Sequence, residues 1–399
     1  MINKLLLPIL FLSVLIGRPS EAGEFSGYAS IESRIFTQEP HFSPQHNQRV
    51  SSSFALQPEY YHRWDEKNQS ITVVPFFRVD QDDKERTHVD IREFFWQKYT
   101  NDLELNIGVR KIYWGVTESQ HLVDIINQTD TLENLDGEDK LGQPMVNLSL
   151  YQDWGILDFF IMPYFRERAF VGKRGRLRGG LLIDDDQVTY DSSAEESHVD
   201  WALRWSHVLG DFDIGLSHFS GTSRVPRLLL GTDNDGNAIY TPHYDLIEQT
   251  GFDLQYTKEG WLWKFEAIHR VGQGESYNAA VGGFEYTLYN IFGSGSDVGF
   301  LAEYNYDDRG ENAPVSSEDD VFLGTRLTFN NEQSTDLLVG FVKDLDSNAS
   351  SVFVETSRRL TDHWKAEIEV SVINGTETGD IGHDLRKDDT VLISLLYYF

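Results

Sequence analysis

Residues 391–399 read VLISLLYYF, and this closing stretch decides the fold. Apolar side chains recur at every second position along it, at Val391, Ile393, Leu395, Tyr397 and Phe399. Successive side chains of a β-strand point to opposite faces, so this spacing predicts a strand with one continuous apolar face. A soluble protein has no reason to end on such a strand with a terminal aromatic residue. The stretch therefore predicts the last strand of a closed transmembrane β-barrel.

The first residues have the features of a secretory signal peptide. Lys4 supplies a positive charge, residues 5–16 form an apolar run, and Ser20-Glu21-Ala22 is a small-x-small cleavage site. The sequence thus predicts a signal peptide over residues 1–22 and a single barrel domain over residues 23–399.

Composition narrows the class of protein. Beyond residue 22 no run approaches the roughly 20 apolar residues of a membrane-spanning helix, and the mean hydropathy is −0.40. A spanning strand exposes only every second residue to lipid, so a barrel sequence is half polar. Cysteine is absent, which excludes disulfides, thiolate metal sites and a cysteine nucleophile. A formal net charge of −30 argues against nucleic acid as a partner and fits acidic loops at a cell surface.

Alternation with period two continues upstream and yields about 18 strand candidates, within a range of about 16 to 18. We therefore predict an all-β, antiparallel up-and-down barrel. A secreted soluble β-sandwich, solenoid or propeller would share the alternation, but no fixed repeat period is visible. The clearest lipid-facing sets are Phe25, Ala29, Ile31 and Ile35; Phe54, Leu56, Tyr60 and Trp64; Leu103, Leu105, Ile107 and Val109; Leu157, Phe159, Ile161 and Phe165; Val199, Trp201, Leu203 and Trp205; Phe212, Ile214 and Leu216; Trp261, Trp263, Phe265 and Ala267; Val298, Phe300, Ala302 and Tyr304; Val321, Leu323, Leu327 and Phe329; and Ala366, Ile368, Val370 and Val372.

The connections between these strands alternate in length. Outer-membrane barrels have long loops outside and tight turns on the periplasmic side, so the alternation supports the barrel independently. Three residues resist the pattern: Pro75 and Pro163 would interrupt a hydrogen-bonded ladder, and Glu93 falls on the lipid-facing parity, which β-bulges or a register error would explain. Long gaps are 38–49, 114–144, 171–197, 221–244, 310–317 and 375–387, and tight turns are 65–68, 101–102, 152–154, 210–211, 259–260, 330–332 and 361–362.

The terminal strand resembles the insertion signal that outer-membrane barrels present to the barrel-assembly machinery. The wider sequence resembles uncharacterised porin-like outer-membrane proteins of Gram-negative bacteria. Residues 90–93 (DIRE), 109–115 (VRKIYWG), 221–224 (GTSR) and 284–287 (FEYT) carry this resemblance. It implies a barrel in the outer membrane, in contact with its lipids and lipopolysaccharide, and says little about substrate.

If the apolar parity faces lipid, the opposite parity lines the lumen. Arg78, Arg92 and Arg110 lie there on nearby strands, and a one-sided cluster of arginines would attract anions. The alternative is ordinary salt bridging with residues such as Asp80, Asp90 and Glu104. The predicted pore-lining set is Arg78, Asp80, Asp90, Arg92, Arg110, Arg166, Arg168, Arg204 and Arg326.

Residues 114–144 are the best candidate for a loop that narrows the pore, because a solvated surface loop needs few aliphatic side chains. We expect this loop to fold into or over the lumen. Its predicted constriction residues are Asp124, Ile125, Ile126, Asp130 and Asp136. Aromatic residues on the lumen parity would either form a track for sugars or apolar solutes, or pack against this loop; they are Phe94, Trp96, Phe160 and Tyr164, with Met162 beside them.

Three further motifs bear on function. The basic run 173–178 (KRGRLR) would bind lipopolysaccharide phosphates, or pair with acids such as 184–186 in a solvated loop. Residues 233–237 (DNDGN) resemble the start of a calcium loop but lack its distal glutamate, which favours a simple turn. His218 and Ser220 share one strand face, as a hydrolase would require, yet no carboxylate is identifiable to orient the histidine.

The sequence supports a passive, porin-like channel of the outer membrane, general or substrate-selective, for small solutes. Neither a cofactor nor a metal is expected, and no catalysis. The alternatives are a hydrolase of outer-membrane lipid or lipid A, and a non-conducting surface or structural barrel.

Overall fold

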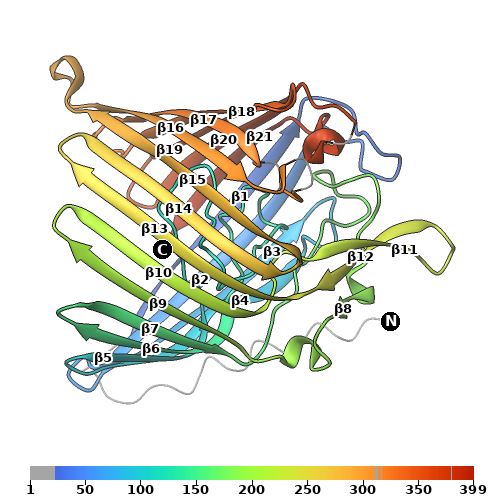
Figure 1. The fold of residues 1–399 in the computed structure, drawn as a ribbon. Coiled ribbons are helices and arrows are strands. Elements are labelled where there is room, and N and C mark those ends of the chain that lie inside the picture. The colour runs from blue at the N-terminus through green and yellow to red at the C-terminus, as the bar shows by residue number, and fades with distance from the viewer. Residues whose placement is uncertain (1–22, 311–312, 316, 379) are drawn as a thin grey trace.

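The computed structural model describes residues 23–310, 313–315, 317–378 and 380–399. The predicted signal peptide, residues 1–22, lies outside these ranges. Within them, 18 strands form one sheet that closes on itself, because the first strand pairs with the last. Figure 1 shows the strands running obliquely around the barrel wall. The predicted all-β, antiparallel up-and-down barrel of about 18 strands is confirmed.

The barrel strands follow one another around the wall in chain order. They are β1 (Glu24–Phe36), β2 (Val50–Trp64), β3 (Gln69–Asp80), β4 (His88–Tyr99), β5 (Leu103–Arg110), β6 (Gln143–Gln152), β7 (Gly155–Met162), β9 (Asp200–Leu209), β10 (Phe212–Thr222), β13 (Leu246–Lys258), β14 (Trp261–Gly272), β15 (Gly274–Leu288), β16 (Asp297–Asp307), β17 (Asp319–Thr328), β18 (Asp336–Asp344), β19 (Ser350–Arg359), β20 (Trp364–Asn374) and β21 (Thr390–Tyr398).

A small second sheet, which the sequence did not predict, projects from one end of the barrel (Figure 1). It consists of β8 (Thr189–Tyr190), β11 (Arg227–Thr232) and β12 (Ala238–Tyr244). The helical elements described are single turns: η1 (Asp185–Gln187), η2 (Glu195–Ser197), η3 (Ile291–Gly293) and η5 (Ile381–Leu385). None of the helices in the described ranges has the length and apolar character needed to cross a membrane.

The closing stretch forms the seam of the barrel. β21 pairs with β1 from Tyr28 opposite Tyr398 to Phe36 opposite Thr390. The Phe399 N–H donates to the Gly27 carbonyl at 3.1 Å, and the Phe399 and Phe25 ring centroids are 5.6 Å apart. The side chains at alternate positions of β21 face outward, as predicted; Ile393, Leu395, Tyr397 and Phe399 are all exposed.

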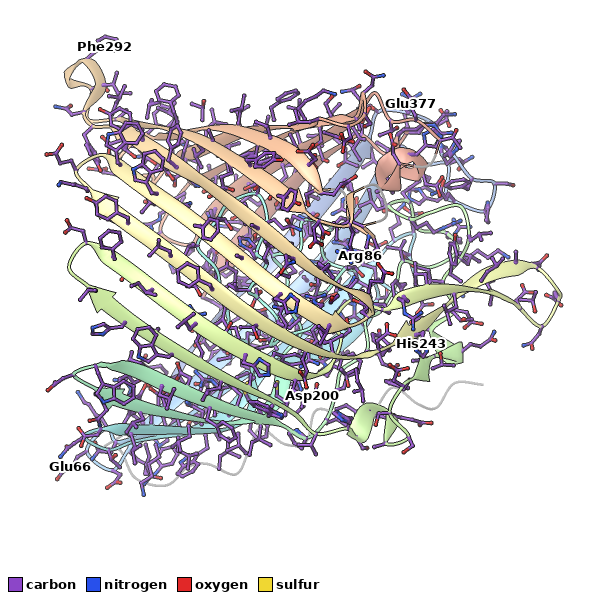
Figure 2. All side chains as sticks on the ribbon, in the orientation of Figure 1. Glu66, Arg86, Asp200, His243, Phe292 and Glu377 are labelled. Atoms are coloured by element: carbon purple, nitrogen blue, oxygen red, sulfur yellow. The ribbon has the colours of Figure 1, made fainter. Side chains whose placement is uncertain are left out.

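Long loops and tight turns lie at opposite ends of the barrel, as predicted. Figure 2 labels Glu66 and Phe292 at one end, which we call the turn end, and His243 and Glu377 at the other, the loop end.

The side chains that alternate along each strand point in turn to the outer face and to the inside of the barrel. Ile31 is 59% exposed and its neighbour Ser30 only 2%. One predicted lipid-facing residue is wrong: Phe165 lies beyond β7, is 1% exposed, and packs edge-on against Tyr244.

A β-bulge changes the parity of β4. Val74 pairs with Glu93, but Pro75 pairs with Ile91, which leaves Arg92 as an extra residue. Proline has no N–H to donate, so it fits where the ladder is interrupted. Beyond the bulge, Phe94 is 51% exposed on the outer face and Phe95 faces inward. The predicted lumen positions of Phe94 and Trp96 are therefore wrong, because both follow the extra residue. Pro163 lies just past the end of β7 and interrupts nothing.

Candidate functional site

Residues 111–142, between β5 and β6, enter the barrel, and we call them the inserted loop. Ile125 is 3% exposed and Ile126 is fully buried. The predicted insertion is confirmed, and Phe160 and Met162 pack against the loop rather than lining a solute track. The loop and the inner wall share one apolar core made of Trp114, Val123, Ile125, Ile126, Met145, Phe160, Met162, Ala202, Phe219, Ile247, Ile268, Tyr277 and Ala279.

Two buried carboxylates hold the tip of the inserted loop. Glu266 on β14 is 0% exposed and accepts hydrogen bonds from the Val116 N–H (2.7 Å), the Thr117 N–H (3.1 Å), the Thr117 hydroxyl (2.8 Å) and the Val123 N–H (3.1 Å). Glu303 on β16 accepts from the Ser119 N–H and hydroxyl, both at 2.7 Å. Hydrogen bonds to a charged acceptor are stronger than neutral ones, so these contacts fix the loop across the lumen. The sequence placed both acids on the lumen face, but it did not single them out from the other lumen acids as the residues that hold the loop.

The arginines at the loop end are neutralised by acids. Arg78 bonds to Glu32 and Glu133, with its closest contact to each at 2.5 Å. Arg92 bonds to Asp130 of the inserted loop at 2.6 Å. Both arginines are at least 94% buried. The structure thus brings Arg78 and Arg92 together with acids of the loop and the wall, rather than leaving an open basic ring.

The remaining predicted pore-lining residues also have partners. Asp80 binds Arg86 at 2.7 Å. The other contacts are Arg110 with Asn147 (3.0 Å), Arg166 with Asp90 (2.7 Å), Arg168 with Gln128 (3.1 Å), Arg204 with Asp253 (2.7 and 2.8 Å) and Arg326 with Glu118 (2.8 Å). The contacts of Arg166, Arg204 and Arg326 are the salt bridges of the alternative prediction, whereas Arg110 and Arg168 bind neutral amide oxygens.

The inserted loop leaves one side of the lumen accessible to solvent. Interior residues of β13, β14 and β16 are sealed under it: Gln249, Glu266 and Glu303 are 0–3% exposed. On the facing wall, Glu355 of β19 is exposed, and Glu367 and Glu369 of β20 are partly exposed. The loop approaches this wall closely, because the Asn134 amide donates to the Glu369 carboxylate at 3.2 Å. The loop and the β19–β20 wall therefore lie close together on this side.

Most of the charged side chains between the inserted loop and the β19–β20 wall are acidic. The register aligns one inward-facing row across β17–β21 and β1: Arg326, Leu338, Glu355, Glu369, Leu392 and Arg34. The charge of Asp136 on the inserted loop acts on both Glu355 and Glu369. We call Glu118, Asp136, Glu138, Glu355 and Glu369 the acidic constriction. Of the predicted constriction residues, Asp136 lies here, while Asp124 is bound to Lys140 at 3.0 Å in the loop interior and Asp130 to Arg92.

Residues 171–180 cross the loop end as a strap. Arg176 is 3% exposed, bonds to Asp388 at 2.6 Å and lies over the Phe36 ring at 4.3 Å. The strap is also held by the Gly172 N–H, which donates to Asp83 at 3.0 Å. In the predicted phosphate-binding run, Arg176 and Arg178 are buried, Arg176 on Asp388 and Arg178 on the strap carbonyls of Lys173 and Gly179. Lys173 and Arg174 are exposed.

The structure shows the surroundings of the His218–Ser220 motif and of the calcium-like motif. The His218 Nδ1 lies 3.0 Å from the Thr250 hydroxyl on the neighbouring strand. No carboxylate hydrogen-bonds to His218 among the residues that the structure describes. The Asp233 carboxylate accepts hydrogen bonds from the N–H groups of Asp235 and Asn237, which makes the segment the turn of the β11–β12 hairpin.

The closed antiparallel wall, apolar outside and polar inside, defines a transmembrane β-barrel. Two solved structures to which the chain is similar are an outer-membrane protein and a porin. OmpT of Vibrio cholerae, in vitro folded and in its trimer form, is 10% identical, with 96% of this chain and 100% of that chain covered and a TM-score of 0.47. A mutant of the Rh. blastica porin is 10% identical, with coverage of 95% and 100% and a TM-score of 0.45. No protein-family model matches the chain, and no curated protein matches it.

Proposed function

We propose that this protein is a passive channel of the outer membrane that conducts small solutes and favours cations. The observation that carries the proposal is the uneven solvent exposure of the lumen: the inserted loop seals the β13–β16 wall but leaves the acids of β19 and β20 accessible. A barrel of this strand number is too wide for wall side chains to fill, so a passage remains beside the loop. A passive channel needs no catalytic residue, cofactor or metal.

The cation preference follows from which charges remain unpaired in the passage. Arg78 and Arg92 of the predicted filter are engaged with acids of the wall and the loop, and Arg110 with the Asn147 amide. Glu355 and Asp136, in contrast, face the passage. Rings of acidic side chains attract cations and repel anions. The expected arrangement in the cell places the turn end at the periplasm and the loop end at the surface, with lipid and lipopolysaccharide around the wall.

Neutralising the wall acids tests this proposal. We expect the purified protein in planar bilayers to conduct, and the Glu355→Gln/Glu369→Gln double variant to lower the K⁺ over Cl⁻ permeability ratio about fivefold, which corresponds to about 1 kcal/mol of lost attraction. The reversal potential across a KCl gradient measures the ratio. Glu259→Gln, in a tight turn, is the control. An unchanged ratio would contradict the assigned filter, and the absence of conductance would contradict the channel.

The cation preference is also expected to depend on pH. Desolvation inside the barrel and the carboxylates of Glu133, Asp136 and Asp130 raise the pKa of Asp139 on the inserted loop to about 7. A carboxyl group with a raised pKa takes up its proton as pH falls through that value, so the loop loses negative charge between about pH 8 and 6. The K⁺ over Cl⁻ ratio should therefore decrease over this window. Asp139→Asn should make the step smaller; a step of unchanged size in this variant would assign it to another group.

A further inference from the structure

An apolar patch lies inside the barrel, next to the acidic constriction. We call it the shelf: Leu301, Phe322 and Leu338 are buried, and Val342 and Phe353 pack against them with part of their surface accessible. These residues belong to β16, β17, β18 and β19 and sit on the inward parity, since the adjacent Phe300, Leu323 and Val339 are exposed on the outer face. Apolar side chains that face a polar passage have no role in membrane anchoring.

Two glycines give the shelf its flat shape. A Cβ atom at Gly340 would lie 2.0 Å from the Phe353 ring, and one at Gly324 would lie 2.8 Å from the Phe322 ring. The two rings are stacked, with centroids 5.8 Å apart and planes 9° from parallel. Because glycine leaves space beneath each ring, the rings lie flat against the wall; the Phe322 ring is fully buried, and the partly accessible Phe353 ring presents the apolar surface to the lumen.

Carboxylates adjoin the shelf along both strands that carry its rings. Glu355 is two residues beyond Phe353 on the same face of β19 and stands opposite Leu338. Asp320 is two residues before Phe322 on β17 and is 2% exposed. Its Oδ2 atom has no hydrogen-bond partner among the described residues. Asp320 is thus closed off, and Glu355 is the accessible carboxylate beside the shelf, where a ligand with a positive charge or N–H groups is favoured.

We infer that the shelf and Glu355 form a binding seat for an organic cation, a solute that joins an apolar or aromatic body to an ammonium group. The body lies on Phe353 and Val342, and the ammonium reaches the Glu355 carboxylate. An aromatic face adds attraction for the cation itself. This inference rests on the proposed function and names its substrate class. A sugar would find few hydrogen-bonding groups on the shelf, and an inorganic ion would gain nothing from it.

The test combines binding and block with simple probes. Phenethylammonium is titrated into the detergent-solubilised full-length barrel by calorimetry, and its block of the K⁺ current is measured in bilayers. Ethylammonium has the charge without the large body, and phenethyl alcohol has the body without the charge. We expect phenethylammonium to bind and block at concentrations at least about tenfold below either analogue. Apolar burial of the ring supplies the difference from ethylammonium, and attraction between the ammonium and Glu355 supplies the difference from phenethyl alcohol.

Variants separate the seat from the channel. Phe353→Ala should reduce the preference for phenethylammonium at least about fivefold, while Phe353→Leu, which retains apolar packing, should reduce it less. Both should keep the K⁺ over Cl⁻ ratio of the unmodified protein. Val352→Ala, the lipid-facing neighbour on the same strand, should change neither property. Equal binding of phenethylammonium and ethylammonium would overturn the seat even if the barrel conducts. Selective binding without any current would overturn the channel but retain the seat.

Discussion

Glu266→Ala is expected to release the tip of the inserted loop, raising the mean single-channel conductance and adding large current fluctuations. The fully buried carboxylate accepts hydrogen bonds from three backbone N–H groups and one hydroxyl of the loop. Its removal leaves buried donors without an acceptor, at a cost of about 3 kcal/mol or more. The loop would then sample positions away from the β13–β16 wall, and the passage would widen intermittently.

The same variant should lower the thermal midpoint measured by circular dichroism in detergent. Glu266→Gln should also be impaired, because both carboxylate oxygens accept hydrogen bonds and an amide can replace only one of them. Glu275→Ala, an exposed position on the adjacent strand, serves as the matched control. If Glu266→Ala left the conductance unchanged and added no current fluctuations, the apolar core alone would hold the loop.

Deletion of Phe399 is expected to reduce the amount of barrel assembled in the outer membrane by about tenfold or more, while export to the periplasm continues. The deletion removes the N–H that donates to Gly27 and the ring that lies against Phe25 at the seam. A strand at an open edge leaves its hydrogen-bonding groups unpaired, which lipid cannot satisfy. Heat-dependent gel mobility of the membrane fraction reports the assembled barrel.

Phe399→Tyr retains the ring and the backbone contact and should assemble normally. If the deleted chain assembled as well as the unmodified one, the terminal residue would have no role in closing the seam. If the deleted chain were absent from both the outer membrane and the periplasm, the defect would instead lie in export.

The wall of the barrel was predictable because one rule governs almost every strand. Contact with lipid requires an apolar side chain at alternate positions of a strand. This requirement acts within each strand, so the alternation can be recognised in a short segment such as 391–399. The loop insertion was also predictable, since aliphatic residues such as Ile125 and Ile126 would be costly in a solvated loop. Sequence alternation does not reveal an inserted residue, so the bulge at Arg92 inverted the predicted positions of Phe94 and Trp96.

The pairing of charges inside the lumen was not predictable in detail. Arg78 and Arg92 lie close in sequence, which suggested a basic ring, but their partners Glu133 and Asp130 belong to the inserted loop, 55 and 38 residues later. The shelf was missed for a similar reason. Its residues come from four strands, and only the register places Phe322, Gly340 and Phe353 together. Arg176 looked like a surface charge because nothing local shows that Asp388 lies beside it.

The apolar core between the inserted loop and the inner wall is shielded from water, whereas the outer face of the barrel is shielded by lipid or detergent. The outer face exchanges lipid for detergent on extraction, a transfer between two oily media that changes the heat capacity little. Unfolding of the interior would instead expose Trp114, Ile126 and Phe160 to water, with the large positive heat-capacity change typical of soluble domains. Hydrophobic attraction weakens on cooling, whereas the hydrogen-bonded wall has no such dependence. The inserted loop, which this apolar core holds, is therefore expected to loosen before the wall on cooling.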